Sequence, residues 1–217
     1  MKDFKIVWSA RSECGPSRKK NEDTIFPPIS GSSKSPFKAA VCDGLGGHVD
    51  GDVASKIAAD TLLKEITDLN QIITEANNNI LEYQEKNPSS LGMGTTMTAI
   101  SIDSDALMKI GHVGDSRCYV LSDRNLIKVT EDQNVPGYQN VLKQALGSNE
   151  KLNIQEVDFQ LQIGDVVFLC SDGLYNEVGE EYIKKKMQDG ISADTFVSEV
   201  LLLNPKDNVS AILINLV

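Results

Sequence analysis

Two kinds of hydrophobic periodicity divide the chain. Between residues 54 and 83, apolar side chains recur every three or four positions, which places them on one face of a helix. The first such face comprises Ala54, Ile57, Ala58, Leu62 and Ile66, and the second comprises Leu69, Ile72, Ile73, Ala76, Ile80 and Tyr83. Asn87-Pro88 follows, and because the residue before a proline disfavours the helical conformation, we expect the second helix to end there.

From Gly92 onward the pattern changes to short apolar or alternating segments, which are typical of strands. Consecutive strands are expected over 95–102, 106–113, 117–123 and 125–130, and later ones over 154–160, 166–170 and 208–217. Earlier strands are expected over 4–8 and 37–42, and a further amphipathic helix over 193–201. Because helices and strands are grouped rather than alternating, the class is predicted to be α+β, with antiparallel sheets and helices outside them.

Length and composition favour one globular domain spanning residues 1–217. The chain is 41% hydrophobic and 24% charged, which is usual for a soluble protein. The segment from Pro27 to Pro36 is interpreted as a surface connection. No apolar stretch approaches the about 18 residues of a membrane span, and no signal peptide is evident. A cytoplasmic location is therefore expected.

The balance of charge excludes some partners. Thirty-one acidic residues against 21 Lys and Arg give a net charge of −10, which argues against nucleic acid and against an anionic membrane surface. It leaves room for a cation site. The four cysteines, at 14, 42, 118 and 170, form no C-x-x-C pair, so buried reduced thiols are expected rather than zinc ligands or disulfides.

Acidic residues stand where several predicted strands end or begin. Asp43, Asp115 and Asp172 each follow an apolar run, and Asp207 precedes the last one. Such residues can be ordinary turn formers. If the strand ends meet at one rim, however, the gathered carboxylates would need a cation, and oxygen-only ligation favours Mg²⁺ or Mn²⁺. The pattern alone leaves both interpretations open.

The glycine-rich segment 43–51 does not match either of the common phosphate-binding loops. A dinucleotide fingerprint would need Gly where Val49 stands, and a P-loop would need Lys where Asp52 stands. Small residues there are better explained by close backbone approach to a ligand or metal before a helix begins.

Six motifs in order resemble one family. They are R-x-x-N-E-D at 18–23, D-G-x-G-G-H-x-x-G at 43–51, G-T-T at 94–96, G-D-S-R at 114–117, S-D-G-L at 171–174 and D-N at 207–208. Together they are similar to the metal-dependent protein serine/threonine phosphatases of the protein phosphatase 2C type, in their bacterial branch. The resemblance implies an αββα sandwich of two antiparallel sheets flanked by helices.

The resemblance also implies roles for the acidic residues. Asp43 resembles the carboxylate that bridges two metal ions, and the backbone carbonyl of Gly44 resembles a ligand of one of them. Asp172 and Asp207 resemble terminal ligands of the other ion. Asp115 matches the acid that, with Asp172, holds a third and weaker metal in many members of the family.

Three residues of the first motif complete the implied site. Glu22 and Asp23 resemble the acids that hold metal-bound waters, and Arg18 resembles the arginine that receives the substrate phosphate. Two divalent ions roughly 3.5–4 Å apart can activate a shared water or hydroxide for attack on phosphorus. A guanidinium can grip two phosphate oxygens at once. The implied function is hydrolysis of phosphoserine and phosphothreonine in proteins, with two Mn²⁺ or Mg²⁺ ions, by a monomer that opposes a serine/threonine kinase.

Some positions depart from the family or have simpler explanations. The segment from Thr130 to Gln144 is short where the family has a flap beside the metals, and this shortening is expected to alter substrate selection. Lys143 stands where an arginine is often found. His112 is expected to be a satisfied core residue, His48 a structural residue at the start of a helix, and Arg117 a partner in a structural ion pair.

Three other functions remain open at this stage. The first is an inactive binding module of the same fold, which the presence of all the core ligands disfavours. The second is a regulatory phosphatase of the sporulation and stress-response type, and the third is an unrelated Mg²⁺-dependent hydrolase of small phosphoesters. Metal-dependent turnover of phosphopeptides and of nucleotides, with and without EDTA, distinguishes these possibilities.

Overall fold

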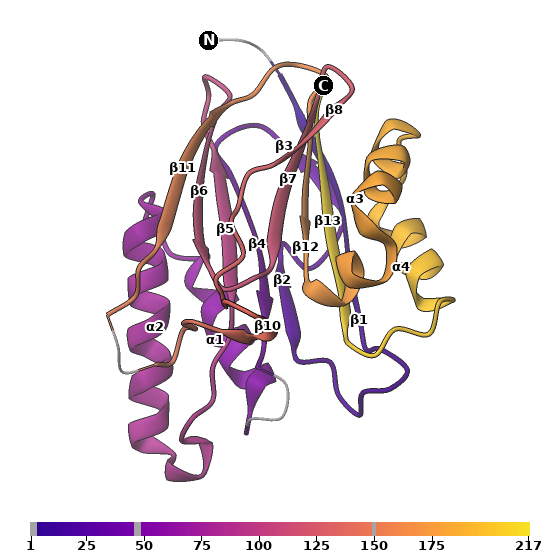
Figure 1. The fold of residues 1–217 in the computed structure, drawn as a ribbon. Coiled ribbons are helices and arrows are strands. Elements are labelled where there is room, and N and C mark those ends of the chain that lie inside the picture. The colour runs from indigo at the N-terminus through magenta and orange to yellow at the C-terminus, as the bar shows by residue number, and fades with distance from the viewer. Residues whose placement is uncertain (1–3, 46–48, 149–150) are drawn as a thin grey trace.

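Two antiparallel sheets packed face to face form the centre of the molecule, and a pair of helices covers each outer face (Figure 1). The computed structural model describes residues 4–45, 49–148 and 151–217, and the side chains of residues 139 and 140 are not described. The predicted α+β class and αββα arrangement are confirmed.

The first sheet has six strands in the order β3-β1-β13-β12-β7-β8. Their bounds are Gly31–Ser33 (β3), Ile6–Glu13 (β1), Val209–Leu216 (β13), Val166–Cys170 (β12), Arg117–Ser122 (β7) and Asn125–Lys128 (β8). The second sheet has the order β11-β6-β5-β4-β2. Its strands are Gln155–Gln160 (β11), Leu107–Val113 (β6), Met97–Ile102 (β5), Phe37–Asp43 (β4) and Asp23–Phe26 (β2).

Alternation along the central strands explains the three layers of core. Because successive side chains of a strand point to opposite faces, one strand can serve two cores. In β4, Ala39 and Val41 pack between the sheets, whereas Ala40 and Cys42 face the helices. β7, β12 and β13 divide their residues in the same way between the intersheet core and the opposite pair of helices.

Helices α1 (Gly51–Thr61) and α2 (Leu69–Lys86) cover the five-stranded sheet, and α3 (Asp172–Gln188) and α4 (Ala193–Leu201) cover the six-stranded one. Asp68 caps α2 by accepting from the Asn70 amide, and Ser192 caps α4 by accepting from the Thr195 amide. A short 3-10 turn, Pro88–Ser90, follows α2 where the proline was expected to end it.

Several boundaries and elements differ from the sequence prediction. The first strand, expected over 4–8, runs from Ile6 to Glu13 because it pairs along its whole length with β13. The segment from Pro27 to Pro36, predicted to be a surface connection, contains β3, which pairs with β1. Helix α1 ends at Thr61, before Ile66. Strand β2 and helix α3 were not predicted, and neither was the hairpin of β9 (Asn134–Val135) and β10 (Tyr138–Leu142).

The cysteine prediction is confirmed for three residues of four. Cys42, Cys118 and Cys170 are buried free thiols in strands, whereas Cys14 is exposed. Within the described ranges, no helix combines the length and the hydropathy that crossing a bilayer requires.

Candidate metal and phosphate site

The predicted acidic residues come from five separate segments that end at one rim of the two sheets. Asp43 is the last residue of β4, and Asp115 lies in the turn between β6 and β7. Asp172 is the first residue of α3, and Asp207 lies just before β13. These four carboxylates line one cleft of about 760 Å³, together with Arg18 from the β1–β2 loop.

Glu22, Asp23 and Gly44 lie beside the cleft lining rather than in it. The Gly44 amide donates to the Glu22 carbonyl at 3.1 Å. Asp23 is opposite Asp43 in the register of β2 and β4. The structure therefore brings all eight predicted site residues to one region. His48 falls outside the described residues.

Close backbone approach explains why glycine follows the acid in both Asp-Gly pairs. A Cβ at Gly44 would lie 2.4 Å from the Gly51 carbonyl oxygen, and one at Gly173 would lie 2.1 Å from that of Asn208. Real Cβ atoms essentially never make contacts this short. Glycine at these positions lets the end of β4 and the start of α3 approach the neighbouring backbone closely.

The backbone around Asp43 is held by two threonines of the G-T-T motif. Thr96 Oγ1 accepts from the Asp43 amide at 3.0 Å and lies 2.8 Å from Ser116 Oγ, next to Asp115. Thr95 Oγ1 donates to the Asp43 carbonyl at 2.9 Å. Because Thr95 and Thr96 are buried, these bonds hold the backbone of Asp43 close to the turn that carries Asp115.

Asp23 is surrounded by polar side chains. Its side chain is buried, and Oδ2 accepts from Ser210 Oγ at 2.6 Å. Burial raises the pKa of Asp23 to about 6, while bonds from Ser210 and Ser171 oppose the rise. The residue thus has the contacts of an orienting group rather than of an exposed turn acid.

The carboxylates of the cleft hinder one another's ionisation. Burial raises the pKa of Asp172 to about 7, and repulsion from Asp115 and Asp207 adds to the effect. Burial and the neighbouring Asp23, Asp172 and Asp115 raise the pKa of Asp43 well above its usual value. Such mutual repulsion is expected where carboxylates are gathered for a cation.

Arg18 is a cationic side chain that lines the cleft beside these carboxylates. Its Nη2 donates to Asp207 Oδ2 at 2.5 Å, its Nη1 lies 3.8 Å from Glu22 Oε2, and its Nε donates to the Lys206 carbonyl at 3.3 Å. The side chain is 29% exposed. The guanidinium therefore reaches solvent at the cleft while remaining beside the carboxylates.

The donor set fits a hard divalent cation. Among the described residues that line the cleft, the groups available as ligands are oxygen atoms, mainly of carboxylates, and no thiolate or imidazole is present. Oxygen is the ligand type that Mg²⁺ and Mn²⁺ accept. In the part of the chain that the structure describes, no three Asp, Glu, His or Cys side chains are close enough to ligate one ion as they stand. Of the four carboxylates that line the cleft, Asp207 is paired with Arg18.

The secondary predictions for Arg117 and His112 are confirmed. Arg117 forms a two-pronged ion pair with Asp132, with Nη2 to Oδ2 at 2.6 Å and Nε to Oδ1 at 3.0 Å. His112 is fully buried between Thr98 and the Glu131 carbonyl. Burial lowers its pKa to about 4, so the imidazole is neutral near pH 7 and acts as a structural residue.

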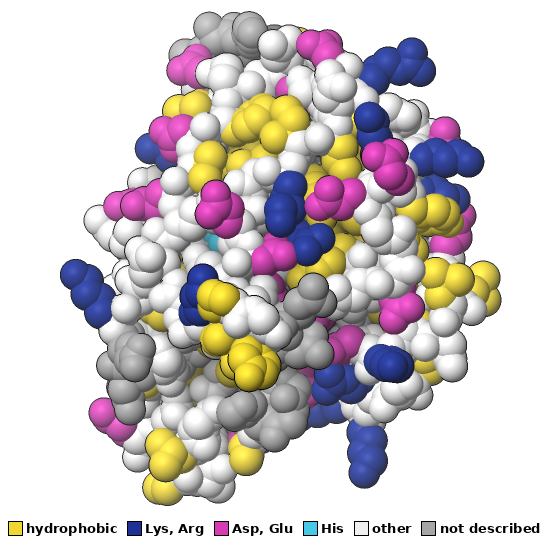
Figure 2. Space-filling view, viewed as in Figure 1, with side chains coloured by type: hydrophobic (Ala, Val, Ile, Leu, Met, Phe, Trp, Pro, Cys, Tyr) yellow, Lys and Arg dark blue, Asp and Glu magenta, His cyan; other side chains and the backbone are white. Residues whose placement is uncertain are grey.

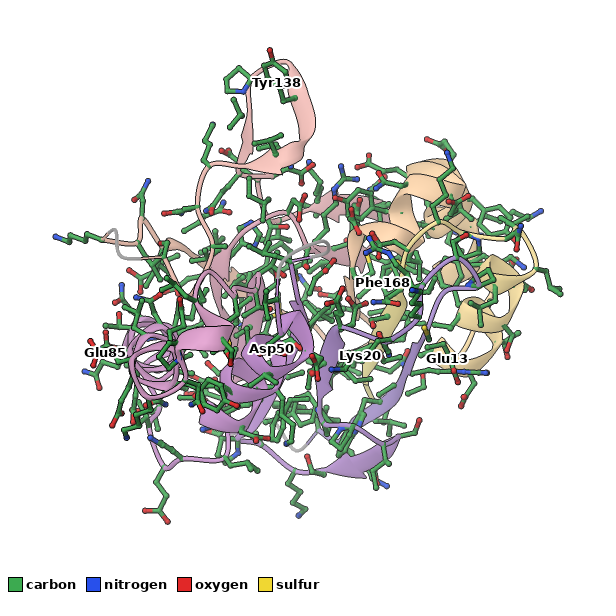
Figure 3. All side chains as sticks on the ribbon, turned by 90° about the horizontal axis from the view of Figure 1, so that it is seen from below. Glu13, Lys20, Asp50, Glu85, Tyr138 and Phe168 are labelled. Atoms are coloured by element: carbon green, nitrogen blue, oxygen red, sulfur yellow. The ribbon has the colours of Figure 1, made fainter. Side chains whose placement is uncertain are left out.

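The β9–β10 hairpin forms one wall of the cleft. Figure 3 shows Tyr138 on this hairpin, which stands away from the body of the molecule. Val141 and Leu142 of β10 line the cleft with the carboxylates. Asn134 at its start donates to Asp115 Oδ2 at 2.9 Å. The sequence predicted a short flap here, but no pattern singled out Asn134 as a partner of Asp115.

Comparisons with known proteins agree with this arrangement. A family model described as protein phosphatase 2C matches residues 16–211. The serine/threonine phosphatase stp of Listeria innocua is 32% identical over 240 residues, covering 94% of this chain and 93% of the relative. The solved serine/threonine phosphatase PstP/Ppp of Mycobacterium tuberculosis has a TM-score of 0.86 at 27% identity, covering 97% and 98% of the two chains.

A PstP catalytic domain has also been solved in complex with two manganese ions. It has a TM-score of 0.86 to this chain at 28% identity, and the match covers 99% of this chain and 100% of the other. The motifs, the layered fold and the family match agree along nearly the whole length of the chain. The chain belongs to the protein phosphatase 2C family.

Proposed function

We propose that this chain hydrolyses phosphoserine and phosphothreonine in proteins with two bound Mn²⁺ or Mg²⁺ ions. The observation that carries the proposal is the convergence of Asp43, Asp115, Asp172 and Asp207 on one cleft beside Arg18. The named phosphatases that the chain resembles, and the two manganese ions in PstP, support it. Divalent ions bound there would lower the pKa of water and offset the charge of the phosphate.

The site residues receive roles on the basis of their positions. Asp43, the last residue of β4, is proposed to bridge the two ions, with the Gly44 carbonyl as a ligand of one. Asp172 and Asp207, from the segments on the other sheet, are proposed to ligate the second. Asp115, which borders Asp172, is proposed to share a third and weaker ion with it. The mutual electrostatic coupling of these carboxylates supports the grouping.

Arg18 is proposed to bind the substrate phosphate. Its guanidinium offers two parallel N–H donors, which match two phosphate oxygens. When Asp207 turns toward a cation, Arg18 loses its strongest partner and can direct both donors into the cleft. The partial exposure of Arg18 and its place in the cleft lining support this role.

Glu22 and Asp23 are proposed to orient water rather than to bind an ion directly. Neither lies in the cleft lining, and Asp23 is already held by Ser210 at 2.6 Å. A carboxylate fixed in this way can accept a proton or a hydrogen bond at a defined position. Its raised pKa, about 6, places that exchange near neutral pH.

The β9–β10 hairpin is proposed to select substrates. Val141 is 49% exposed and Tyr138 is 66% exposed, although Val141 also lines the cleft. Apolar side chains held in water next to the reaction site can gain free energy by contacting the substrate protein. Because the hairpin is short, its contacts would lie close to the phosphorylated residue.

One experiment tests the function and its alternatives. Hydrolysis of a phosphothreonine peptide is measured with Mn²⁺, with EDTA, and with Asp43→Asn as the control. The proposal predicts metal-dependent turnover that the variant loses. Absence of turnover in the loaded wild type would favour a binding module, and faster turnover of nucleotides than of phosphopeptides would favour a small-phosphoester hydrolase.

The cellular setting is proposed with the function. The chain is taken as one domain over 1–217, because β4, β7, β12 and β13 each serve two of the three cores. A monomer that opposes a serine/threonine kinase in the cytoplasm is the corresponding expectation, and the three buried free thiols suit a reducing compartment. Light scattering of the purified chain tests the monomer.

A further inference from the structure

A guanidinium outside the cleft connects the segments that carry its carboxylates. Arg117 stands at the start of β7, two residues after Asp115. Its Nη2 and Nε bind the two oxygens of Asp132 at 2.6 and 3.0 Å, and its side chain is only 18% exposed. A two-pronged pair of this kind fixes the orientation of the guanidinium as well as its distance.

The face of the same guanidinium lies against Tyr175. Arg117 Cζ is 3.5 Å from the centre of the Tyr175 ring. The tyrosine is 7% exposed, and its hydroxyl donates to the backbone carbonyl of Asp115 at 3.0 Å. Because Tyr175 lies in the first turn of α3, three residues after Asp172, this contact ties the Asp115 turn to the helix that begins with Asp172.

The side chain of Asp115 is held from a third segment. Asn134, two residues after Asp132, donates to Asp115 Oδ2 at 2.9 Å. Arg117 therefore packs against the ring of Tyr175, whose hydroxyl holds the Asp115 backbone. It also binds Asp132, in the segment that leads to Asn134. The backbone of Asp115 is held by Tyr175, which Arg117 contacts, and the carboxylate of Asp115 is held by a residue two positions from the Arg117 partner Asp132.

We propose that Arg117, acting through Tyr175, is a positioning residue that sets the separation of Asp115 and Asp172. It thereby sets the affinity of the third, weaker divalent-ion site that these two carboxylates share (the outer site). The inference rests on the proposed function, because it requires Asp115 to be a metal ligand. Arg117 contacts neither the ion nor the substrate in this scheme. Partners behind metal ligands typically change metal affinity by about 10- to 100-fold.

The test is a Mn²⁺ binding isotherm of the metal-free full chain, measured by calorimetry. Asp115→Asn defines the component that belongs to the outer site. Tyr175→Phe keeps the ring beneath Arg117 and removes only the hydroxyl, so it should weaken that component about three- to tenfold. Arg117→Lys keeps the positive charge but loses the planar guanidinium that makes two hydrogen bonds to Asp132. It should weaken Mn²⁺ binding at the outer site by about tenfold or more.

Lys128→Ala is the matched control. Lys128 Nζ also reaches Asp132 Oδ1, at 3.4 Å, but its removal leaves the guanidinium on Asp132 and Tyr175. This variant should bind Mn²⁺ as the wild type does. In Tyr175→Phe, the Mn²⁺ concentration that gives half-maximal phosphopeptide hydrolysis should rise, while the hydrolysis rate at saturating Mn²⁺ should stay close to that of the wild type. General destabilisation of the fold would not separate these two quantities.

The outcomes separate this inference from the proposed function. If Tyr175→Phe binds Mn²⁺ with the same isotherm as the wild type, the positioning role is overturned, even where Arg117→Lys fails to fold. An isotherm unchanged in Asp115→Asn overturns it as well, because no outer ion would then depend on Asp115. Absence of any Mn²⁺ uptake by the wild type would instead contradict the proposed function.

Discussion

At the residue scale, the site depends on buried polar contacts that hold the carboxylates in place. Thr96 is 2% exposed, and its hydroxyl accepts from the Asp43 amide while contacting Ser116. Thr96→Val keeps the shape but leaves a buried N–H without a partner, so the free energy of unfolding should fall by about 1–3 kcal/mol. Urea denaturation measures this, with Thr96→Ser as the control that retains the hydroxyl. Equal losses in both variants would contradict the hydrogen-bond explanation.

The raised pKa values of Asp172 and Asp23, about 7 and about 6, predict how the metal-free protein responds to pH. Between their ordinary pKa near 3.8 and these values, the folded state holds protons that the unfolded state has released. These groups therefore stabilise the fold below pH 4 and lose that contribution as pH rises toward 7. Urea denaturation without metal should show stability falling from pH 4.5 to 7.5. Asp172→Asn should flatten part of that slope, and an identical slope in both proteins would exclude Asp172 as its source.

The site residues differ in how far the sequence alone could find them. Asp43 and Asp172 each precede a glycine that close backbone packing requires, and both acidic residues were predicted. Arg18 was identified only through its spacing to Glu22 and Asp23. Asn134 and Tyr175 were not identified, because their roles arise from contacts with Asp115 across the fold that no local pattern encodes.

At the scale of elements, strong periodicity predicted structure and weak periodicity did not. Helix α2 shows a regular apolar face and was predicted through to its end at Lys86, just before the Asn87-Pro88 pair. Helix α3 was missed because few of its apolar residues fall on one face, and Gly179 interrupts its backbone with a φ of 70°. Strand β3 has only three residues, Gly31–Ser33, without an apolar pattern, and it exists because β1 offers a free edge.

The β9–β10 hairpin gives a prediction about substrate binding. Val141→Asp places a charge where the cleft wall is apolar, so KM for a phosphothreonine peptide should rise about tenfold, with little change for p-nitrophenyl phosphate. Ile163→Asp is the control, since Ile163 is 60% exposed and lines a different cavity. Equal effects of Val141→Asp on both substrates would show that the hairpin acts on the metal site rather than on the peptide.

At the scale of the whole molecule, the acidic balance is partly a property of the site. Figure 2 shows acidic and basic side chains interspersed on the face it presents. Two divalent ions would offset four of the ten net negative charges. The α+β class was predictable from grouped helices and strands, whereas the layered αββα arrangement was implied by the family resemblance. The meeting of five chain segments at one rim was given only by the family resemblance.

Metal binding should therefore stabilise the entire fold. With Mn²⁺ at about one hundred times its Kd, the gain is about 2.7 kcal/mol for one site. For a chain of this size that corresponds to an increase in Tm of roughly 5–10 °C. Thermal melts with and without Mn²⁺ measure it, and Asp43→Asn should respond much less. An unchanged melting temperature of the wild type in Mn²⁺ would contradict a cation site built from these carboxylates.

The most direct test is the rate of phosphate release from a phosphothreonine peptide by the wild type, Asp43→Asn and Asp172→Asn in Mn²⁺. We expect turnover in the wild type that EDTA abolishes and that excess Mn²⁺ restores. Both variants should fold, as circular dichroism would show, and should lose at least about a thousandfold in rate, consistent with the loss of electrostatic stabilisation at the reacting phosphate. Full activity in either folded variant would contradict the assignment of these carboxylates to the metal site.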